Sequence, residues 1–356
     1  MFDLHYLCWQ IHQMRQVHTD HSLLSYNTFR VESTASYFSE PSDINELREL
    51  MDYCQQRDLE FLVIGEGSNL LFKSNFKGLV IHPLIKGIQK IDESQTEILV
   101  RVGAGENWDN FVSVCVENLW YGPENLSLIP GTVGSAPVQN IGAYGREVKD
   151  IVEYVEVFDT QNGELTMLSN SACEFGYRDS IFKHGESKRF IVTSTVFKLK
   201  KSADLLLDYG KVKEYFEEKP KQNLAALRDT IIEIRQQKLP DPEKYGNGGS
   251  FFKNPVIKKS LFEDLKMEND SIPHYPAEGN RVKIPAAWLI DQCGWKGHRE
   301  GDVGCWPKQA LVLVNYGAAS GEEIYQFSEK IAASVSDKFN INLEREVRVI
   351  DSLPHL

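Results

Sequence analysis

The sequence predicts an α+β protein, because segments with helical and strand periodicity alternate along the chain. Residues 42–58 place apolar side chains at helical spacing behind a Ser-Asp start, and residues 61–65 form a short apolar run typical of a buried strand. Residues 97–118 predict a strand, a turn and an amphipathic helix, and the segments 152–159 and 189–200 predict further strands. Towards the end, residues 320–339 predict a capped helix and residues 341–350 a closing strand.

Composition narrows the classes of function. The chain has 356 residues, of which 42% are hydrophobic and 25% charged, so two or three domains with a sizeable core are expected. The formal net charge of −12 argues against broad binding of nucleic acid or anionic membranes. The six cysteines form no CxxC pair and the histidines no metal-binding spacing, so neither a zinc site nor a disulfide framework is indicated. No apolar run approaches about 18 residues, so a cytoplasmic protein that does not span a membrane is expected.

The most informative segment is the glycine-rich stretch 128–146. It contains Gly131, Gly134, Gly142 and Gly145 and carries no charge before Arg146. Glycines allow main-chain amides to approach a ligand closely, and without charged side chains those amides would supply most of the polarity. The stretch therefore predicts a main-chain binding loop for a cofactor phosphate.

Two more glycine-rich segments lie at 65–72 and 246–255. Because three such segments occur in one chain, we interpret the stretch 128–146 as a binding loop and not as a plain turn. Leu70 stands where the last glycine of a dinucleotide fingerprint would be, and no Walker lysine follows, which argues against a Rossmann dehydrogenase and a P-loop kinase. Gly249-Ser250 lacks the nucleophile elbow of a serine hydrolase. A neutral serine hydroxyl can instead donate a proton to a strong base such as an enolate, which points to a reaction that first adds hydride.

Three charged segments admit two interpretations each. Strand periodicity at 341–350 places Glu346 and Arg348 on one face, as a solvated charge ladder or as a pair aimed into a cleft. Arg178 either forms a surface ion pair with Asp179 or has a functional role. The charged stretch from Lys200 to Asn223 is interpreted as an insertion or a mobile linker.

The chain resembles the UDP-N-acetylenolpyruvoylglucosamine reductase family over nearly its whole length. The segments that carry the resemblance occur in the family's order, at 27–29, 64–72, 102–108, 129–145, 175–183, 246–255, 286–297, 308–315 and 343–348.

This resemblance implies the domain organisation. An FAD-binding region of the vanillyl-alcohol-oxidase/PCMH type would span 20–200, as two α/β subdomains at about 20–85 and 86–200, with the C-terminal strand 340–356 returning to the first. A charged insertion at 201–223 would act as a lid that carries Tyr209, and 224–339 would form the α+β substrate-binding domain. Such members bind FAD without a Rossmann fingerprint, in agreement with the missing motif.

The resemblance also implies a reaction. NADPH reduces the FAD, and hydride passes from flavin N5 to UDP-N-acetylglucosamine enolpyruvate, giving UDP-N-acetylmuramate for peptidoglycan synthesis. Ser250 matches the proton donor, while Arg178 and Glu346 match the groups that stabilise the enolate-like intermediate. An ionised Glu346 would repel the substrate carboxylate, so we expect it to be protonated or to act through a hydrogen bond, tuned by Arg348.

Ligand-contacting positions follow from the same resemblance. Those expected to contact FAD are Gly65, Glu66, Gly67, Ser68, Asn69, Leu70, Pro130, Gly131, Thr132, Gly134, Ser135, Gln139, Asn140, Gly142, Ala143 and Tyr144. Those expected to contact substrate are Tyr209, Arg235, Lys238, Asn254, Gln309 and Arg348, and no metal is expected.

The chain departs from the family pattern at Gly248, at Arg345 and in the loop 301–310, where Cys305-Trp306 could alter contacts on the substrate side. Two other classes stay open at this point: a related flavin oxidase acting on a small alcohol or sugar, and a flavin- or nucleotide-sugar-binding protein without activity. Intact Arg178, Ser250 and Glu346 argue against the second. A monomer is expected.

Overall fold

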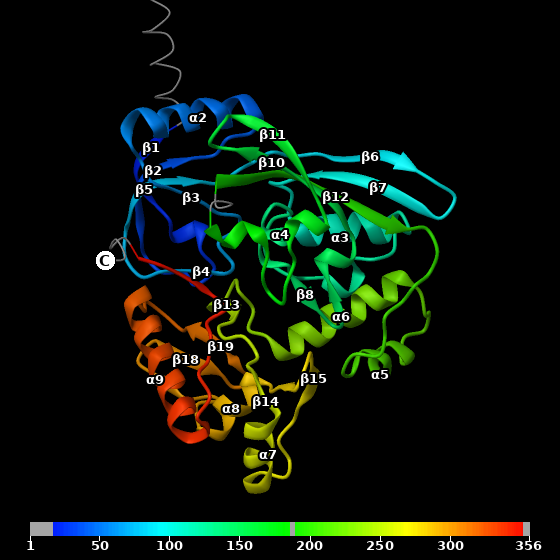
Figure 1. Ribbon diagram of the computed structural model, residues 1–356, viewed down its shortest axis with the longest axis vertical. Coiled ribbons are helices and arrows are strands. Elements are labelled where there is room, and N and C mark those ends of the chain that lie inside the picture. Colours follow the sequence, from blue (N-terminus) through cyan, green and yellow to red (C-terminus); the bar gives the residue numbers. More distant parts are fainter. Residues whose placement is uncertain (1–16, 186–188, 352–356) are drawn as a thin grey trace, which may run out of the picture. The chain divides into compact units, whose positions relative to one another are not determined.

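The computed structural model describes residues 17–185 and 189–351. Internal packing divides them into two compact units (Figure 1). The first unit comprises residues 17–21, 35–66 and 77–237, and the second comprises residues 22–34, 67–76 and 238–351. The domain boundaries proposed from the sequence stay a prediction.

The first unit begins with a four-stranded sheet in the order β1-β2-β5-β3. Its strands are β1 (His18–Ser22), β2 (Thr34–Ser39), β5 (Phe76–Ile81) and β3 (Phe61–Val63). Helix α2 (Ile44–Arg57) begins at Asp43, whose carboxylate accepts hydrogen bonds from two N–H groups of the first turn. Its apolar face, including Leu47 and Leu50, packs with Leu79 and Ile81 of β5, as the helical spacing predicts.

A five-stranded antiparallel sheet forms the main core of the first unit (Figure 1), in the order β11-β10-β12-β7-β6. The strands are β6 (Ile88–Glu93), β7 (Glu97–Gly103), β10 (Val152–Asp159), β11 (Glu164–Ser169) and β12 (Phe190–Lys200). Helix α3 (Trp108–Glu117) packs on this sheet through Trp108 and Phe111, and the Phe111 and Phe197 rings stack with centroids 4.7 Å apart.

Short elements complete the first unit: the 3-10 helix η2 (Glu124–Leu126), α4 (Ser135–Gln139), β8 (Gly142–Ala143), β9 (Arg146–Glu147), α5 (Val212–Glu217) and α6 (Leu224–Lys238). The interpretation of 200–223 as a sparsely apolar linker missed its packing. Val212 and Phe216 are buried against Leu227 and Ile231 of α6, because the few apolar residues of the segment fall on one side.

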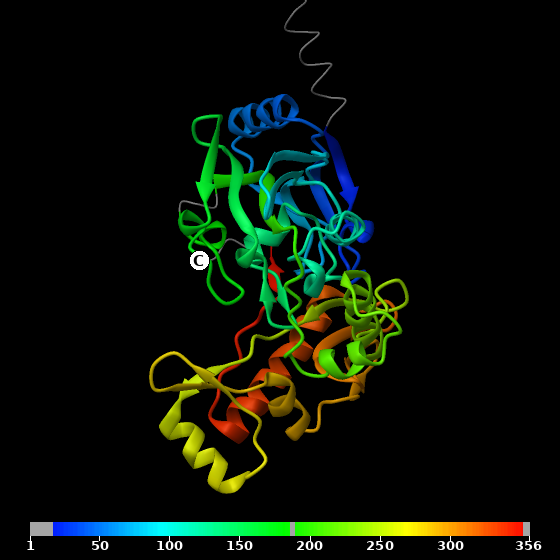
Figure 2. The ribbon, with the colours of Figure 1, turned by 90° about the vertical axis from the view of Figure 1, so that its right-hand side faces the viewer.

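The second unit contains a sheet in the order β13-β19-β18-β17, built from β13 (Gly246–Ser250), β19 (Gln309–Asn315), β18 (Val303–Trp306) and β17 (Arg299–Glu300). A smaller sheet of β14 (Val256–Lys258), β16 (Arg281–Lys283) and β15 (Tyr275–Ala277) lies beside α7 (Lys259–Glu268) (Figure 2). Helices α8 (Ala286–Gln292) and α9 (Gly321–Phe339) complete it, and Ser320 begins α9 with the expected capping box.

Two expectations for the second unit need correction. Residues 246–250 form a strand rather than a turn, and glycine is needed there because a Cβ on Gly246 would lie 2.2 Å from the carbonyl oxygen of Phe29. The closing strand β20 is only Arg348–Ile350, paired in parallel with β4 (Leu70–Phe72). Before it, the N–H groups of Glu346 and Val347 both donate to Phe251, so the backbone does not alternate as a regular strand. Residues 352–356 of the predicted segment lie outside the described residues.

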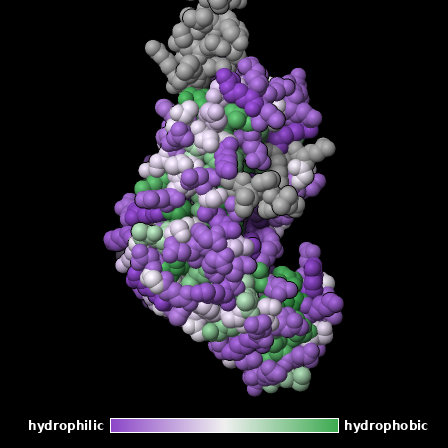
Figure 3. Space-filling view, turned by 90° about the vertical axis from the view of Figure 1, so that its left-hand side faces the viewer, coloured by the Kyte–Doolittle hydropathy of each residue, from purple (hydrophilic) through white to green (hydrophobic). Residues whose placement is uncertain are grey.

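The surface in Figure 3 is mainly hydrophilic, with scattered apolar residues. Among the described residues, no helix combines the length and apolar character needed to cross a bilayer. The α+β fold class is confirmed.

The first turn of α9 lies against β4 with no room for a side chain, because a Cβ on Gly321 would lie 1.8 Å from the carbonyl oxygen of Phe72. We expect Gly321→Ala to lower the free energy of unfolding by about 2–3 kcal/mol, since the backbone must move apart. Gly163→Ala is the control: its φ of +74° carries strain of about 1 kcal/mol, but its Cβ would meet no atom within 4 Å. Equal losses for both variants in urea unfolding would contradict the close contact.

Candidate active site

Carboxylates hold the glycine-rich loop in the first unit. The Glu66 carboxylate accepts a hydrogen bond from the Gly131 N–H at 2.8 Å and another from the Asn107 amide at 2.6 Å. The Asp109 carboxylate accepts from the Leu128 N–H at 2.5 Å, where the loop begins. Glu66 is expected to contact the cofactor. Its bond to Gly131 also joins the glycine-rich segment 65–72 to the stretch 128–146.

The same loop is packed too closely for larger residues. A Cβ on Gly65 would lie 2.7 Å from Oγ1 of Thr132, and a Cβ on Gly134 would lie 2.6 Å from that of Ala104. Thr132 donates its N–H to Ser135 Oγ at 3.1 Å, and Gly134 donates to the Ala104 carbonyl at 2.8 Å. These amides are thus used within the loop, which differs from the expectation that they supply most of the polarity to a ligand.

Free main-chain donors lie instead in the neighbouring glycine segment. The N–H groups of Gly65 and Glu66 make no hydrogen bond to any residue in the described part of the chain. Successive unpaired N–H groups form a concavity that suits a phosphate oxygen, and no side chain at Gly65 obstructs it. The residues present therefore fit the pyrophosphate of an FAD.

The glycine-rich stretch 128–146 is called the cofactor loop from here on. Arg178 is held by residues near the end of this loop. Its guanidinium donates to the Gly142 carbonyl at 2.5 Å and the Asn140 carbonyl at 3.5 Å, and lies 3.7 Å from the Glu147 carboxylate. Asp179 pairs with His184 at 2.7 Å. The interpretation of Arg178 as an ion-pair partner of Asp179 is therefore wrong: among the described residues Asp179 pairs with His184, while Arg178, at a φ of +56°, bonds to carbonyls of the loop.

Other loop residues support this arrangement. Asn140 is fully buried in the left-handed region at φ +42°, and its amide donates to the Gly176 carbonyl at 2.7 Å. Lys183 joins Gln139 to the Arg178 carbonyl, through ammonium hydrogen bonds of 3.0 and 2.9 Å. Glu147 and Lys183 were not singled out from the sequence, where each is one charged residue among many.

The segment that carries Tyr209 is docked on the loop. Asn125, which is fully buried, donates through its amide to both the Tyr144 carbonyl at 3.0 Å and the Leu206 carbonyl at 2.9 Å. The Tyr144 and Tyr209 rings meet edge to face with centroids 6.2 Å apart, and burial raises the pKa of Tyr144. The Tyr209 side chain is still half exposed. Asn125 carries no motif that sequence analysis could have recognised.

Helix α6 brings basic groups to the same unit. The Arg228 guanidinium donates two hydrogen bonds to the Asp109 carboxylate, at 2.7 and 2.8 Å. Burial raises the pKa of Asp109, but the bonds from Arg228 and Leu128 outweigh it and keep that pKa below its usual value. Arg235 has a buried Nε without a hydrogen-bond partner among the described residues, and burial lowers its pKa. A desolvated guanidinium that can still donate a hydrogen bond suits an anionic ligand.

In the second unit, Ser250 and Glu346 are brought together through the main chain. Gly249, at φ +68°, lies in a register irregularity of β13 just before Ser250. The next residue, Phe251, accepts a hydrogen bond from the Glu346 N–H at 2.8 Å. Asn69 then donates to the Glu346 carbonyl and accepts from the Arg348 N–H, both at 3.0 Å.

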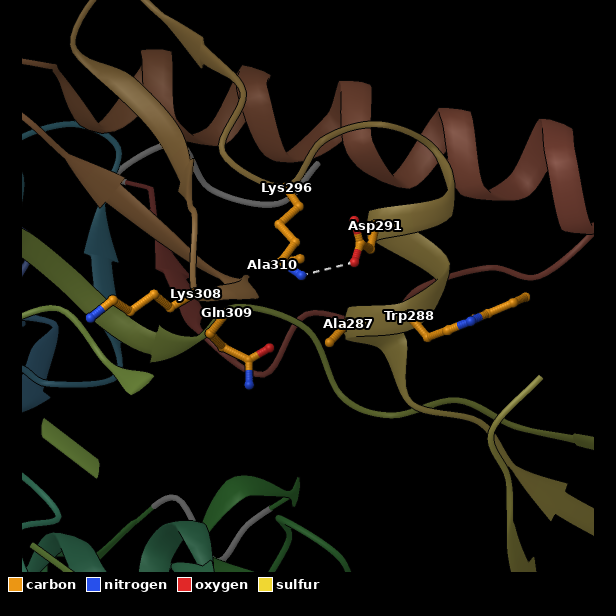
Figure 4. Close-up of a pocket in the computed structure, with 7 residues that line it drawn as sticks. All are labelled: Ala287, Trp288, Asp291, Lys296, Lys308, Gln309 and Ala310. Atoms are coloured by element: carbon orange, nitrogen blue, oxygen red, sulfur yellow. Dashed lines mark hydrogen bonds and ion pairs between the residues drawn. The ribbon is translucent and has the colours of Figure 1, made fainter. Parts of the chain in front are cut away.

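The other substrate positions of the second unit lie on separate elements. Asn254 accepts the Ala286 N–H at 2.9 Å and so supports the start of α8. Gln309 begins β19 and lines a cavity of about 130 Å³ (Figure 4), together with Ala287, Trp288, Asp291, Lys296, Lys308 and Ala310. Lys296 and Asp291 form an ion pair at 3.1 Å on its wall.

The predicted site residues are thus divided between the units. The first unit holds Gly65, Glu66, the cofactor loop, Arg178, Tyr209 and Arg235. The second holds Gly67, Ser68, Asn69, Leu70, Lys238, Ser250, Asn254, Gln309, Glu346 and Arg348.

Comparison with known proteins identifies the family. Residues 241–350 match the model of the UDP-N-acetylenolpyruvoylglucosamine reductase C-terminal domain, and residues 35–169 match that of an FAD binding domain. A UDP-N-acetylenolpyruvoylglucosamine reductase of Bacteroides fragilis is 46% identical over 330 residues, covering 93% of this chain and 99% of that protein. The chain belongs to the UDP-N-acetylenolpyruvoylglucosamine reductase family.

Other members of this reductase family agree. The reductase of Pseudomonas putida is 44% identical over 327 residues, covering 91% of this chain and 96% of its own length. The crystal structure of the Thermus caldophilus reductase has the same fold, with a TM-score of 0.64 at 24% identity over 94% of this chain and 98% of that one. The resemblance seen in the sequence and the expectation that the chain binds FAD are confirmed, while the bounds 20–200 stay a prediction.

The cofactor loop gives a direct test of FAD binding. We expect Gly134→Ala to weaken FAD binding about tenfold, because the added methyl would lie 2.6 Å from the Ala104 Cβ and displace the loop. Titration of the apoprotein with FAD, followed by visible absorbance, measures this. Gly279→Ala, whose Cβ would meet no atom within 4 Å, serves as control. Unchanged FAD affinity in Gly134→Ala would show that the loop does not shape the cofactor site.

Proposed function

We propose that the chain reduces UDP-N-acetylglucosamine enolpyruvate to UDP-N-acetylmuramate with NADPH, in the synthesis of peptidoglycan precursors. The observation that carries this proposal is the similarity to reductases of this name over 93% of the chain and 99% of the relative. When bound, FAD supplies hydride transfer between NADPH and the enolpyruvyl double bond. A cytoplasmic location and a monomeric state belong to the same proposal.

Arg178 stabilises the negative charge that develops on the substrate carboxylate when hydride adds to the terminal carbon of the enolpyruvyl double bond, because the electron pair then moves towards the carboxylate. Its guanidinium is held by the Gly142 and Asn140 carbonyls, so little reorganisation is needed during the reaction. The nearby Glu147 carboxylate also pairs with Lys149 at 2.7 Å, which leaves positive charge in excess around Arg178. A preorganised donor of this kind is worth about 3–4 kcal/mol of transition-state stabilisation.

Ser250 donates the proton to the carbon that does not receive hydride. It ends β13 and pairs with Val312 of β19, directly after the irregularity at Gly248 and Gly249. Glu346, whose N–H is bonded to the residue after Ser250, supports the intermediate through a protonated carboxyl or a hydrogen bond. A pH–rate profile unchanged by Glu346→Gln would remove this role.

The remaining residues bind the UDP-sugar. The unpaired Nε of Arg235 and the half-exposed ring of Tyr209 lie in the first unit, and Lys238, Asn254, Gln309 and Arg348 in the second. Basic groups at these positions provide the local positive charge that a diphosphate needs in a chain of net charge −12.

The first experiment is spectroscopic. The purified protein is expected to bind FAD, to lose its visible absorbance with NADPH under anaerobic conditions, and to recover it when the enolpyruvyl substrate is added. A protein that stays colourless with added FAD would defeat the proposal.

Separate half-reactions test Ser250. We expect Ser250→Ala to leave reduction by NADPH unchanged and to slow reoxidation by the enolpyruvyl substrate by several orders of magnitude, because only the second step needs the proton. Anaerobic stopped-flow absorbance measures both. Ser336→Ala, on α9, is the control, and an equal loss in both half-reactions of Ser250→Ala would remove Ser250 from the proton-donor role.

Tyr209 tests the docked segment. We expect Tyr209→Ala to raise the KM for the UDP-sugar about tenfold while leaving the KM for NADPH unchanged, because the ring would close over the substrate alone. Tyr215→Ala, in the adjacent α5, controls for general loosening of the segment. If Tyr209→Ala behaves like wild type with both substrates, the lid assignment is wrong.

A further inference from the structure

The turn between β18 and β19 departs from the family pattern and is not explained by the reaction. Strands β18 and β19 are joined by Pro307 and Lys308 alone, so Trp306 and Gln309 face each other as the closing pair. The conformation of Trp306 therefore bears directly on where Gln309 begins β19. Gln309 is one of the positions proposed to contact substrate.

The Trp306 side chain reaches a second such position. Its indole N–H donates to the carbonyl of Lys238 at 3.1 Å. The ring also packs against Tyr245, with centroids 5.4 Å apart, and Tyr245 in turn packs edge to face against Tyr316 at 5.6 Å. These contacts hold the indole on both its polar and its apolar sides, so that it presents the N–H in a defined direction.

The carbonyl that accepts this bond lies at the C-terminal end of α6. Lys238 is the last residue of α6, and the last carbonyl groups of a helix have no partner within the helix. Residues just beyond a helix often satisfy those carbonyls with their own N–H groups, but here the chain continues as Leu239-Pro240-Asp241-Pro242, in which both prolines lack one. The indole N–H of Trp306 donates to one of these last carbonyls, that of Lys238.

We propose that Trp306 is a positioning residue for substrate binding: it fixes the main chain at Lys238 and sets the start of β19 at Gln309. The inference rests on the proposed function, in which both residues contact the UDP-sugar. A lysine is a flexible four-carbon arm, so holding its backbone reduces the freedom lost when the ammonium group binds an anion. Trp306 itself makes no contact with the reacting atoms and should affect affinity rather than the chemical step.

The primary test is Trp306→Phe, which keeps an aromatic ring beside Tyr245 but removes the N–H. We expect the dissociation constant for the UDP-sugar to rise about three- to tenfold, in line with the loss of one hydrogen bond, with reduction by NADPH unchanged. Perturbation of the flavin spectrum measures substrate binding. Trp306→His retains a ring N–H and is expected to restore part of the affinity. Wild-type affinity in Trp306→Phe overturns the inference.

Trp295→Phe is the matched control. The Trp295 indole also donates one hydrogen bond, to Ser334 Oγ at 2.6 Å, and packs against Phe327 of α9. Among the described residues, no hydrogen bond or ring contact joins it to a proposed substrate position, so its loss should leave the affinity for the UDP-sugar unchanged. An equal loss of affinity in Trp295→Phe would show a general loosening and overturn the positioning role.

A double-mutant cycle with Lys238→Ala tests whether Trp306 acts through Lys238. If it does, Trp306→Phe should change the dissociation constant for the UDP-sugar much less in the Lys238→Ala background than in the wild type. Any change that remains would be the effect of Trp306 on Gln309. Full additivity of the two losses overturns the inference while the proposed function stands. If Lys238→Ala alone leaves the affinity unchanged, the substrate contact assigned to Lys238 is wrong and the inference falls with it.

Discussion

The first unit depends on one carboxylate, that of Asp109. This carboxylate accepts one hydrogen bond from the N–H of Leu128, where the cofactor loop begins, and two from the guanidinium of Arg228 on α6. Helix α6 carries Arg235 and the apolar residues on which the Tyr209 segment packs. The bonds to Asp109 outweigh the cost of its burial, as its lowered pKa indicates. Through Asp109, α3 therefore holds the start of the loop directly and the Tyr209 segment by way of α6.

The second unit positions its groups with the main chain instead of with charge pairs. Phe251 receives the N–H of Glu346, and Asn69 binds the backbone on both sides of Val347. Main-chain contacts thus set the positions of Ser250 and Glu346. A site built in this way tolerates changes in side-chain charge better than changes in backbone path. Glycine is accordingly found where β13 lies against Phe29.

The sequence was sufficient for the helices and long strands, since α2, α3, α9 and the strands β7, β10 and β12 have strong periodicity and clear caps. Prediction from the sequence failed where main-chain contacts between distant segments determine the secondary structure. Gly246-Asn247-Gly248-Gly249 is typical of a turn, and it becomes a strand because it pairs with the distant β19 and lies against Thr28 and Phe29. Residues 341–347 alternate in polarity, yet two successive N–H groups share one carbonyl. Sequence motifs indicated Arg178, but its anchor Glu147 and the bridging Asn125 have no local signature, because their partners are distant carbonyl and guanidinium groups.

Asn125 has a thermodynamic consequence for how ligands communicate. One amide group binds the carbonyls of Tyr144, in the cofactor loop, and Leu206, in the Tyr209 segment. If FAD binds with different affinity when that segment is docked and when it is released, the docking equilibrium must change by the same factor on binding FAD. The effect is reciprocal, so the change in FAD affinity on docking and the change in docking on binding FAD would measure one coupling free energy. The buried Asn125 amide would be the physical link through which such a coupling passes.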